Sequence, residues 1–232
     1  MIVRDLGDAW QVVLQTDHAD LSAAFARAWS EPLPPSLVLA TERHDDGWAV
    51  WEQSPQLDED GTPINFFDVD VRSHLAFYRA GIAAITEEDE GAGLLVSMHG
   101  AGIYRQRYGL DTSLGLTRAA EVQGDVDAFI AEQEAKFGGD PGERQADYTL
   151  LQLFDRLSLY FCMRDVVAGE EAELQDYRLE PVGPWRVKLT PYPFASDPAH
   201  FSLLRRIVPK GGAVDILAAT PQETTITIES AV

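Results

Sequence analysis

The residues with the clearest capacity for chemistry are the histidines, of which the 232-residue chain has only five. Four of them lie one apiece on four predicted helices, and these are His18, His44, His74 and His99. An acid, Asp45, directly follows the second of them. Imidazole and carboxylate groups together are suitable ligands for iron, manganese, nickel, cobalt and zinc. These residue types predict a site for one or two divalent transition metals.

A further carboxylate, Asp155, lies in the middle of the most apolar predicted helix. A lone carboxylate in such a helix is costly unless it is paired or bound to a metal. Gln152 and Ser158 share its helical face, which makes a small polar stripe in a core helix. No two candidate ligands have the spacing of a local chelate, so only the tertiary fold can gather them. Facing helices project such ligands inward.

The elements that must position these residues are predicted to be mostly helices. Apolar spacing predicts helices over 16–29, 35–48, 70–85, 90–108, 122–137 and 141–164, with a connector at 109–121. Prolines after about residue 177 exclude long helices there, and alternation over 224–228 predicts strands. We therefore expect a mainly α protein. Its helical metal-binding domain spans 16–170, and a small β unit is formed by 1–15 and 178–232.

The order of these residues resembles the ligand pattern of the HD-domain superfamily of metal-dependent phosphohydrolases. The pattern is His18, then the His44-Asp45 doublet, then Asp155 within Leu153-Phe154-Asp155-Arg156-Leu157, and it covers roughly residues 16 to 165. His44-Asp45-Asp46-Gly47 is similar to the turn of the HD-GYP branch. That branch has a lysine in place of Trp48, and its Gly-Tyr-Pro motif is absent here. The whole chain also resembles a bacterial family of unknown function that shares His-Asp-Asp-Gly-Trp and Pro-x-Pro-Phe segments, the latter at 191–194.

The resemblance implies an HD-type helical bundle with a mono- or dinuclear centre. His18, His44, Asp45 and Asp155 would hold one ion, and Asp45 would bridge to a second ion held by His74 and His99. Water activated by the metal would attack a phosphoester. Asp46 is a candidate for orienting a ligand histidine at the catalytic centre. The cationic candidates for gripping phosphate are Arg43, Arg72, Arg105 and Arg156.

Three alternatives remain open at the level of sequence. The same six ligands resemble those of HD-type di-iron oxygenases, which act on small polar substrates. The chain is alternatively a non-catalytic HD scaffold that binds a ligand. His74 and His99 alternatively are hydrogen-bonded core histidines, which would leave a single ion.

The charge balance restricts the partners. The formal net charge is −20, from 38 acids against 18 bases, which disfavours nucleic acids and anionic lipids. A small-molecule substrate is therefore expected. The single cysteine, Cys162, cannot form an intrachain disulfide, and no apolar run approaches the ~20 residues of a membrane span. We expect a cytoplasmic protein.

Overall fold

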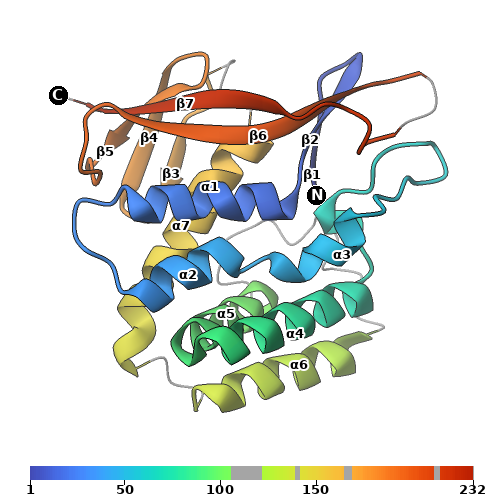
Figure 1. Ribbon diagram of the computed structural model, residues 1–232, viewed down its shortest axis with the longest axis vertical. Helices are drawn as coiled ribbons and strands as arrows, with labels where there is room; N and C mark the ends of the chain where they lie inside the picture. Colours follow the sequence, from blue (N-terminus) through green and yellow to red (C-terminus); the bar gives the residue numbers. More distant parts are fainter. Residues whose placement is uncertain (106–121, 139–141, 165–168, 212–214, 232) are drawn as a thin grey trace.

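A curved β-sheet lies over a layered set of helices in this protein (Figure 1). The computed structural model describes residues 1–105, 122–138, 142–164, 169–211 and 215–231. The predicted connector at 109–121 and the predicted helix start at 141 lie outside the described residues. None of the helices described is long and apolar enough to cross a membrane.

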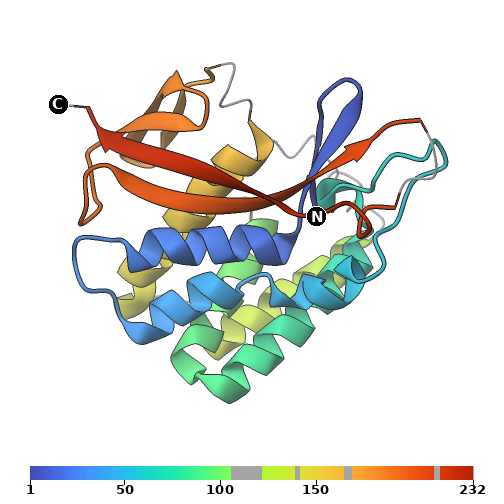
Figure 2. The same cartoon turned by 45° about the horizontal axis from the view of Figure 1, so that its top comes forward.

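The sheet has seven strands in the order β1-β2-β6-β7-β5-β4-β3. Neighbouring strands are antiparallel except β5 and β7, which are parallel, so the sheet is mixed. The strands are β1 (Ile2–Asp5), β2 (Ala9–Val13), β3 (Ala172–Leu174), β4 (Tyr177–Gly183), β5 (Arg186–Thr190), β6 (Ala199–Pro209) and β7 (Gln222–Ser230). Figure 2 shows β6 and β7 crossing above the helices as the two longest strands.

The expectation of a mainly α HD-type bundle with a small β unit is wrong, because a seven-stranded mixed sheet makes this an α/β fold. The cause lies in β6. Its first part, 199–205, pairs with β7, and its last part, 206–209, pairs with β2. One long strand thus joins both chain ends into a single sheet. Hydrophobic periodicity reveals the type of an element but not its distant pairing partners, so the strands looked like a minor unit.

The helices occur close to the predicted positions, with one informative exception. The long helices are α1 (Gln15–Arg27), α2 (Pro35–Arg43), α4 (Val71–Glu88), α5 (Glu90–Tyr104), α6 (Gln123–Lys136) and α7 (Gln145–Met163). The short ones are η1 (Asp46–Trp48), α3 (Ala49–Glu52), η2 (Phe66–Asp68) and η4 (Gly142–Arg144). The predicted helix over 35–48 instead ends at Arg43. His44 and Asp45 therefore lie in the turn between α2 and η1.

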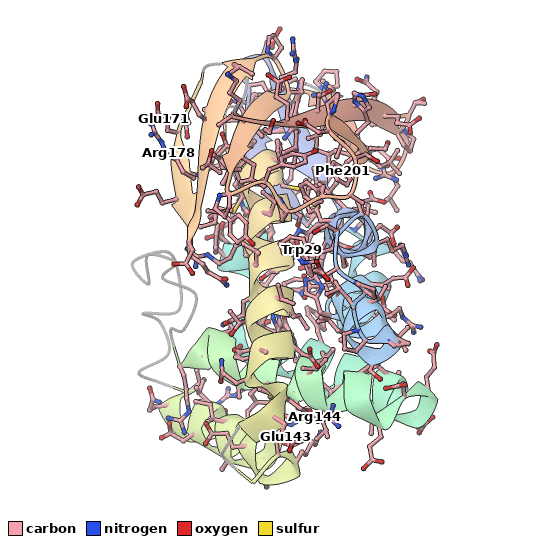
Figure 3. The ribbon with its side chains drawn as sticks, turned by 90° about the vertical axis from the view of Figure 1, so that its left-hand side faces the viewer. Trp29, Glu143, Arg144, Glu171, Arg178 and Phe201 are labelled. Carbon is pink, nitrogen blue, oxygen red and sulfur yellow. The ribbon has the colours of Figure 1, made fainter. Side chains whose placement is uncertain are left out.

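Two apolar clusters surround the region where the candidate ligands lie. The first lies between the sheet and helices α1 and α7, and it includes Phe25, Phe161, Phe201 and Leu203. The second joins α2, α4, α5, α6 and the start of α7, and it includes Leu37, Ile82, Leu95, Phe129 and Leu151. Helix α7 contributes to both and runs from the sheet to the lower helices (Figure 3). Its middle, which carries Asp155, therefore lies where the two clusters meet.

Candidate metal centre

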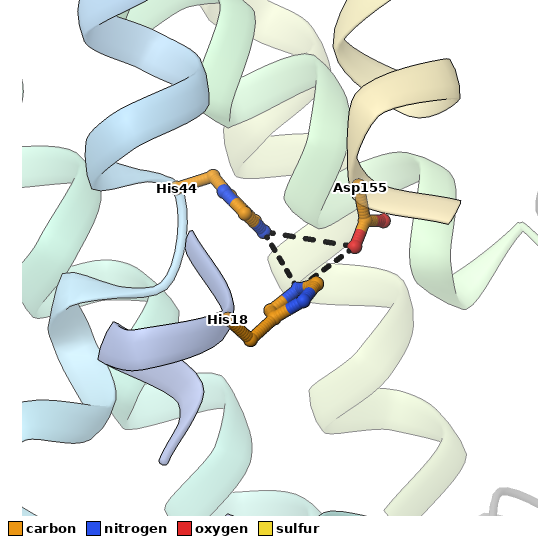
Figure 4. Close-up of side chains that lie close together, drawn as sticks. All are labelled: His18, His44 and Asp155. Atoms are coloured by element: carbon orange, nitrogen blue, oxygen red, sulfur yellow. Dashed lines mark hydrogen bonds and ion pairs between the residues drawn. The ribbon is translucent and has the colours of Figure 1, made fainter. Parts of the chain in front are cut away.

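Three buried side chains from three separate segments converge inside the protein (Figure 4). His18 comes from α1, His44 from the turn after α2, and Asp155 from α7. The two Nε2 atoms of His18 and His44 are 3.3 Å apart. Asp155 Oδ1 lies 3.0 Å from the first of these nitrogens and 3.7 Å from the second. The structure thus gathers three candidate ligands that are far apart in sequence.

The outer nitrogens of both histidines are held by the protein. His44 Nδ1 lies 2.9 Å from the carbonyl oxygen of Thr41, which only accepts, so this nitrogen carries a proton. His18 Nδ1 contacts the hydroxyl of Ser158, which itself donates to the backbone carbonyl of Asp155 at 3.1 Å. These contacts favour the neutral tautomers in which Nδ1 carries the proton. In those tautomers both inner Nε2 atoms present lone pairs to the centre. Metal-binding histidines are fixed in this way.

Asp45 contributes one oxygen to the same centre and a second oxygen to an adjacent group. Its Oδ2 lies 3.5 Å from His44 Nε2 and 3.8 Å from His18 Nε2. Its Oδ1 accepts a hydrogen bond of 2.7 Å from the phenol of Tyr78. That phenol also lies 3.4 Å from His99 Nε2. Donor atoms of His44, Asp45 and His99 all lie within 4.8 Å of one another, which makes a second candidate ligand group.

These distances fit a bound ion. Two donors about 2.1 Å from one ion are separated by about 3.0 Å in octahedral and about 3.4 Å in tetrahedral geometry. The inner atoms of His18, His44 and Asp155 are separated by 3.0 to 3.7 Å. Asp45 Oδ2 lies 3.5 Å from His44 Nε2 and 3.8 Å from His18 Nε2. Two imidazoles with two carboxylates are also a donor chemistry that transition metals accept. The residues present therefore fit a divalent ion.

The turn that carries His44 and Asp45 is fixed by a close approach of two backbones. A Cβ on Gly47 would lie 2.0 Å from the carbonyl oxygen of Phe77 in α4. A Cβ on Gly81, one turn later in α4, would lie 3.0 Å from the backbone nitrogen of Gly47. Only glycine allows this contact, because any side chain would push the turn away from α4. The His-Asp-Asp-Gly segment therefore ends in glycine for a packing reason.

The electrostatics of the centre set His44 apart from its neighbours. Burial lowers the pKa of His44, but the attraction of Asp45 and Asp155 outweighs it and raises that pKa to about 9. Burial likewise opposes ionisation of Asp155, yet hydrogen bonds to His18 and His44 hold its pKa well below the usual range. Burial, followed by the charge on His44, lowers the pKa of His99 to about 4. The carboxylates thus hold a proton on His44, in the place that a metal ion would take.

His74 is not brought into either donor group. Its Nδ1 contacts the hydroxyl of Tyr104, and its ring packs against Trp48 at a centroid distance of 5.2 Å. Burial lowers the pKa of His74 to about 4, so the ring is neutral at pH 7. The two groups of donors found among the described residues contain His18, His44, Asp45, His99 and Asp155. Five of the six residues expected as ligands therefore come together, and His74 lies beside them.

The arginines expected to grip phosphate mostly have other partners. Arg43 binds Asp46 and also donates to Glu88 Oε2 at 2.8 Å. Arg72 pairs with Asp125 on the surface at 2.8 Å. Arg105 pairs with Glu134, with one contact of 2.7 Å. Asp46 is thus engaged by an arginine rather than by a ligand histidine. Arg156, next to Asp155 on α7, is partly buried and forms no ion pair within the described part of the chain.

Tyr78 was not among the residues expected at the site. Its ring lies in the second apolar cluster. Its hydroxyl nevertheless reaches Asp45. The available signal was its position four residues after His74, which puts both on one helical face.

One family model matches residues 1–210 of the chain, and its description reads "Protein of unknown function (DUF3891)". Comparison with curated proteins gives no match, and comparison with solved structures gives none either. The family match covers the strands β1 and β2, all the helices and most of the remaining sheet. It includes every residue of the candidate metal centre.

Proposed function

We propose, starting from a chain that belongs to the DUF3891 family, that the protein is a metal-dependent hydrolase of a small phosphoester substrate. His18, His44, Asp45 and Asp155 would hold the ion. The observation that carries the proposal is the convergence of the inner donor atoms of His18, His44 and Asp155 at separations of 3.0 to 3.7 Å. Asp45 Oδ2 lies 3.5 and 3.8 Å from the two histidine nitrogens. Such a cluster of buried polar groups is expensive unless it serves a purpose of this kind.

The protein's own residues supply two things to this chemistry. Ser158 and the Thr41 carbonyl fix the ring orientation of His18 and His44. Asp45 and Asp155 bring two negative charges, which a divalent ion balances. When bound, such an ion acts as a Lewis acid that activates water near neutral pH. Because Arg43, Arg72 and Arg105 have acidic partners, an anionic substrate would depend on the charge of the ion, with Arg156 as the remaining cationic candidate next to Asp155.

The first test combines metal content with hydrolysis. Protein freed of metal is given zinc, manganese, cobalt, nickel or ferrous iron, desalted, and assayed for bound metal. The same samples are assayed with mono- and bis-(4-nitrophenyl) phosphate. We expect at least about one tightly held ion per chain and hydrolysis that depends on the metal. Both should be lost in His18→Ala and in Asp155→Asn.

The matched control is His200→Ala. His200 is exposed on β6, where its Nδ1 lies 3.2 Å from Thr227 Oγ1, far along the chain from the centre's residues. It should retain metal and activity. Wild-type protein that retains no ion would contradict the proposal. Protein that retains ions but hydrolyses no phosphoester with any of these metals would contradict it as well.

A second candidate function is di-iron oxygenation of a small polar substrate. The observation that favours it is the second donor group, His44, Asp45 and His99, which shares His44 with the first. Asp45 Oδ2 also lies 3.8 Å from His18 Nε2 of the first group. Protein loaded anaerobically with ferrous iron would then hold two irons per chain. Oxygen uptake that requires a substrate, with no phosphoester hydrolysis, would favour this function over the first.

A further inference from the structure

The phenol of Tyr78 lies between two residues of the second donor group. It lies 2.7 Å from Asp45 Oδ1 and 3.4 Å from His99 Nε2. Each of these two atoms belongs to a residue of the second donor group. Tyr78 itself is nearly fully buried, with 5% of its surface exposed. Three donors of three different types thus meet at one point inside the protein.

Asp45 connects this point with the first donor group. Its Oδ2 lies near the inner nitrogens of His18 and His44, whereas its Oδ1 faces Tyr78. A carboxylate arranged in this way can serve two ions, one through each oxygen. His44 cannot, because its Nδ1 is used by the Thr41 carbonyl and only its Nε2 remains. A second ion would therefore need a donor other than His44, and the phenol of Tyr78 lies next to Asp45 Oδ1.

The backbone holds Tyr78 in that position. It lies in α4 directly after Phe77, whose carbonyl oxygen is in close contact with Gly47 of the ligand-bearing turn. Gly81, three residues later, contacts the same turn. The distance between Tyr78 and Asp45 is thus set by backbone packing rather than by a flexible side chain. Preorganised donors of this kind are what a metal site requires.

We infer that Tyr78 is a metal ligand, and that Tyr78, Asp45 and His99 form a second subsite suited to ferric iron. The inference rests on the proposed metal centre, of which it is a part. Tyrosine oxygen is a known iron ligand in proteins. On binding, the phenol gives its proton to the buffer, because ligands bind metals in the deprotonated form. His74, which the sequence suggested for this place, keeps Tyr104 as its partner.

The test uses the visible absorption of ferric phenolate complexes. Metal-free protein is loaded with ferric citrate, desalted, and examined for iron content, visible absorption and resonance Raman scattering. We expect a charge-transfer band with phenolate ring modes in the wild type. Tyr78→Phe should lose the band and one iron per chain while it remains folded at the temperature of the assay. Tyr104→Phe, which removes a neighbouring phenol next to His74, should keep both.

The outcomes separate this inference from the proposed function. A band that survives in Tyr78→Phe, or wild-type protein that binds ferric iron without phenolate modes, overturns the assignment of Tyr78. If that wild type still holds a divalent ion through His18 and Asp155, the hydrolase proposal stands. Wild-type protein that retains neither ferric nor divalent ions contradicts both. Should Tyr78→Phe fail to fold, the phenolate modes of the wild type and of Tyr104→Phe still decide the matter.

Discussion

His44 is buried and His74 is partly buried in the same region, yet their surroundings shift their pKa values in opposite directions. Burial lowers the pKa of each ring. For His44 the nearby Asp45 and Asp155 outweigh burial, and the pKa rises to about 9. For His74 burial prevails, and the pKa falls to about 4. The carboxylates, and not burial itself, distinguish the two histidines.

His44 therefore lies in a charged centre, whereas His74 lies among uncharged aromatic rings. Around His44, two buried carboxylates require a cation, which is either a proton or a metal ion. Around His74, the neighbours are Trp48, Tyr78 and Tyr104, whose rings lie 5.0 to 5.6 Å away and bring no charge. We therefore expect metal chemistry at the first and a structural role at the second. Four experiments test this distinction.

The largest effect is expected from Asp155→Asn, which keeps the shape of the side chain and removes a charge from the centre. Its metal affinity should fall by more than the roughly 100-fold that loss of an outer hydrogen bond can cost. His74→Phe should change the affinity little, because His74 lies outside the donor groups. Competition with a metal-chelating dye measures both. Equal losses of metal affinity in the two variants would contradict a metal-binding role for Asp155 and a structural role for His74.

Gly47→Ala should break the turn that carries His44 and Asp45 towards the centre. The added Cβ would meet the Phe77 carbonyl oxygen at 2.0 Å, so we expect a loss of about 1–3 kcal/mol in the free energy of unfolding. Metal affinity should fall with it. Gly124→Ala in α6 is the control, since no atom lies within 4 Å of its Cβ. Chemical denaturation compares the two, and a Gly47→Ala variant as stable as Gly124→Ala would exclude this account of the glycine.

Metal affinity should rise with pH. In the metal-free protein His44 has a pKa of about 9 against an ordinary 6.5, so an incoming ion must displace a proton below pH 9. Affinity should therefore increase about tenfold per pH unit from 7 to 9 and then level off. The same raised pKa stabilises the metal-free fold fully below about 6.5, and this stabilisation is lost as the pH rises towards 9.

Titrations at pH 7, 8 and 9 measure this slope. His74→Phe should show the same slope as the wild type, because the pKa of His74, about 4, lies below this range. A wild-type affinity that does not change with pH would show that His44 carries no proton in the metal-free centre.

The smallest effect is expected from the exposed arginines. Arg72→Ala and Arg105→Ala each remove a surface ion pair, with Asp125 and Glu134 respectively. Such pairs contribute little to stability, because water and salt screen them. Neither melting temperature nor metal affinity should change measurably by calorimetry and dye competition. A clear loss of hydrolysis in Arg72→Ala alone would instead assign that arginine to substrate binding.

Several parts of this protein were accessible from sequence. Helical periodicity located α1, α4, α5, α6 and α7 to within a few residues of their observed bounds. The cost of burying Asp155 in an apolar helix pointed to a partner, and His18 lies 3.0 Å from it. Residue type and the resemblance of their order to the HD pattern gave six candidate ligands, of which His18, His44, Asp45, His99 and Asp155 lie together and His74 does not. These are local properties, so the sequence displays them directly.

Other parts were decided only by the tertiary structure. The sheet joins segments about 200 residues apart, as in the pairing of Ala9 with Pro209, and no local pattern encodes such a partner. The choice between His74 and Tyr78 was equally hidden, because both lie on one face of α4. Backbone packing at Gly47 placed the phenol of Tyr78 against Asp45 and left His74 with Tyr104. Sequence determined which residues were capable of binding a metal, and packing between distant backbones determined which of them meet.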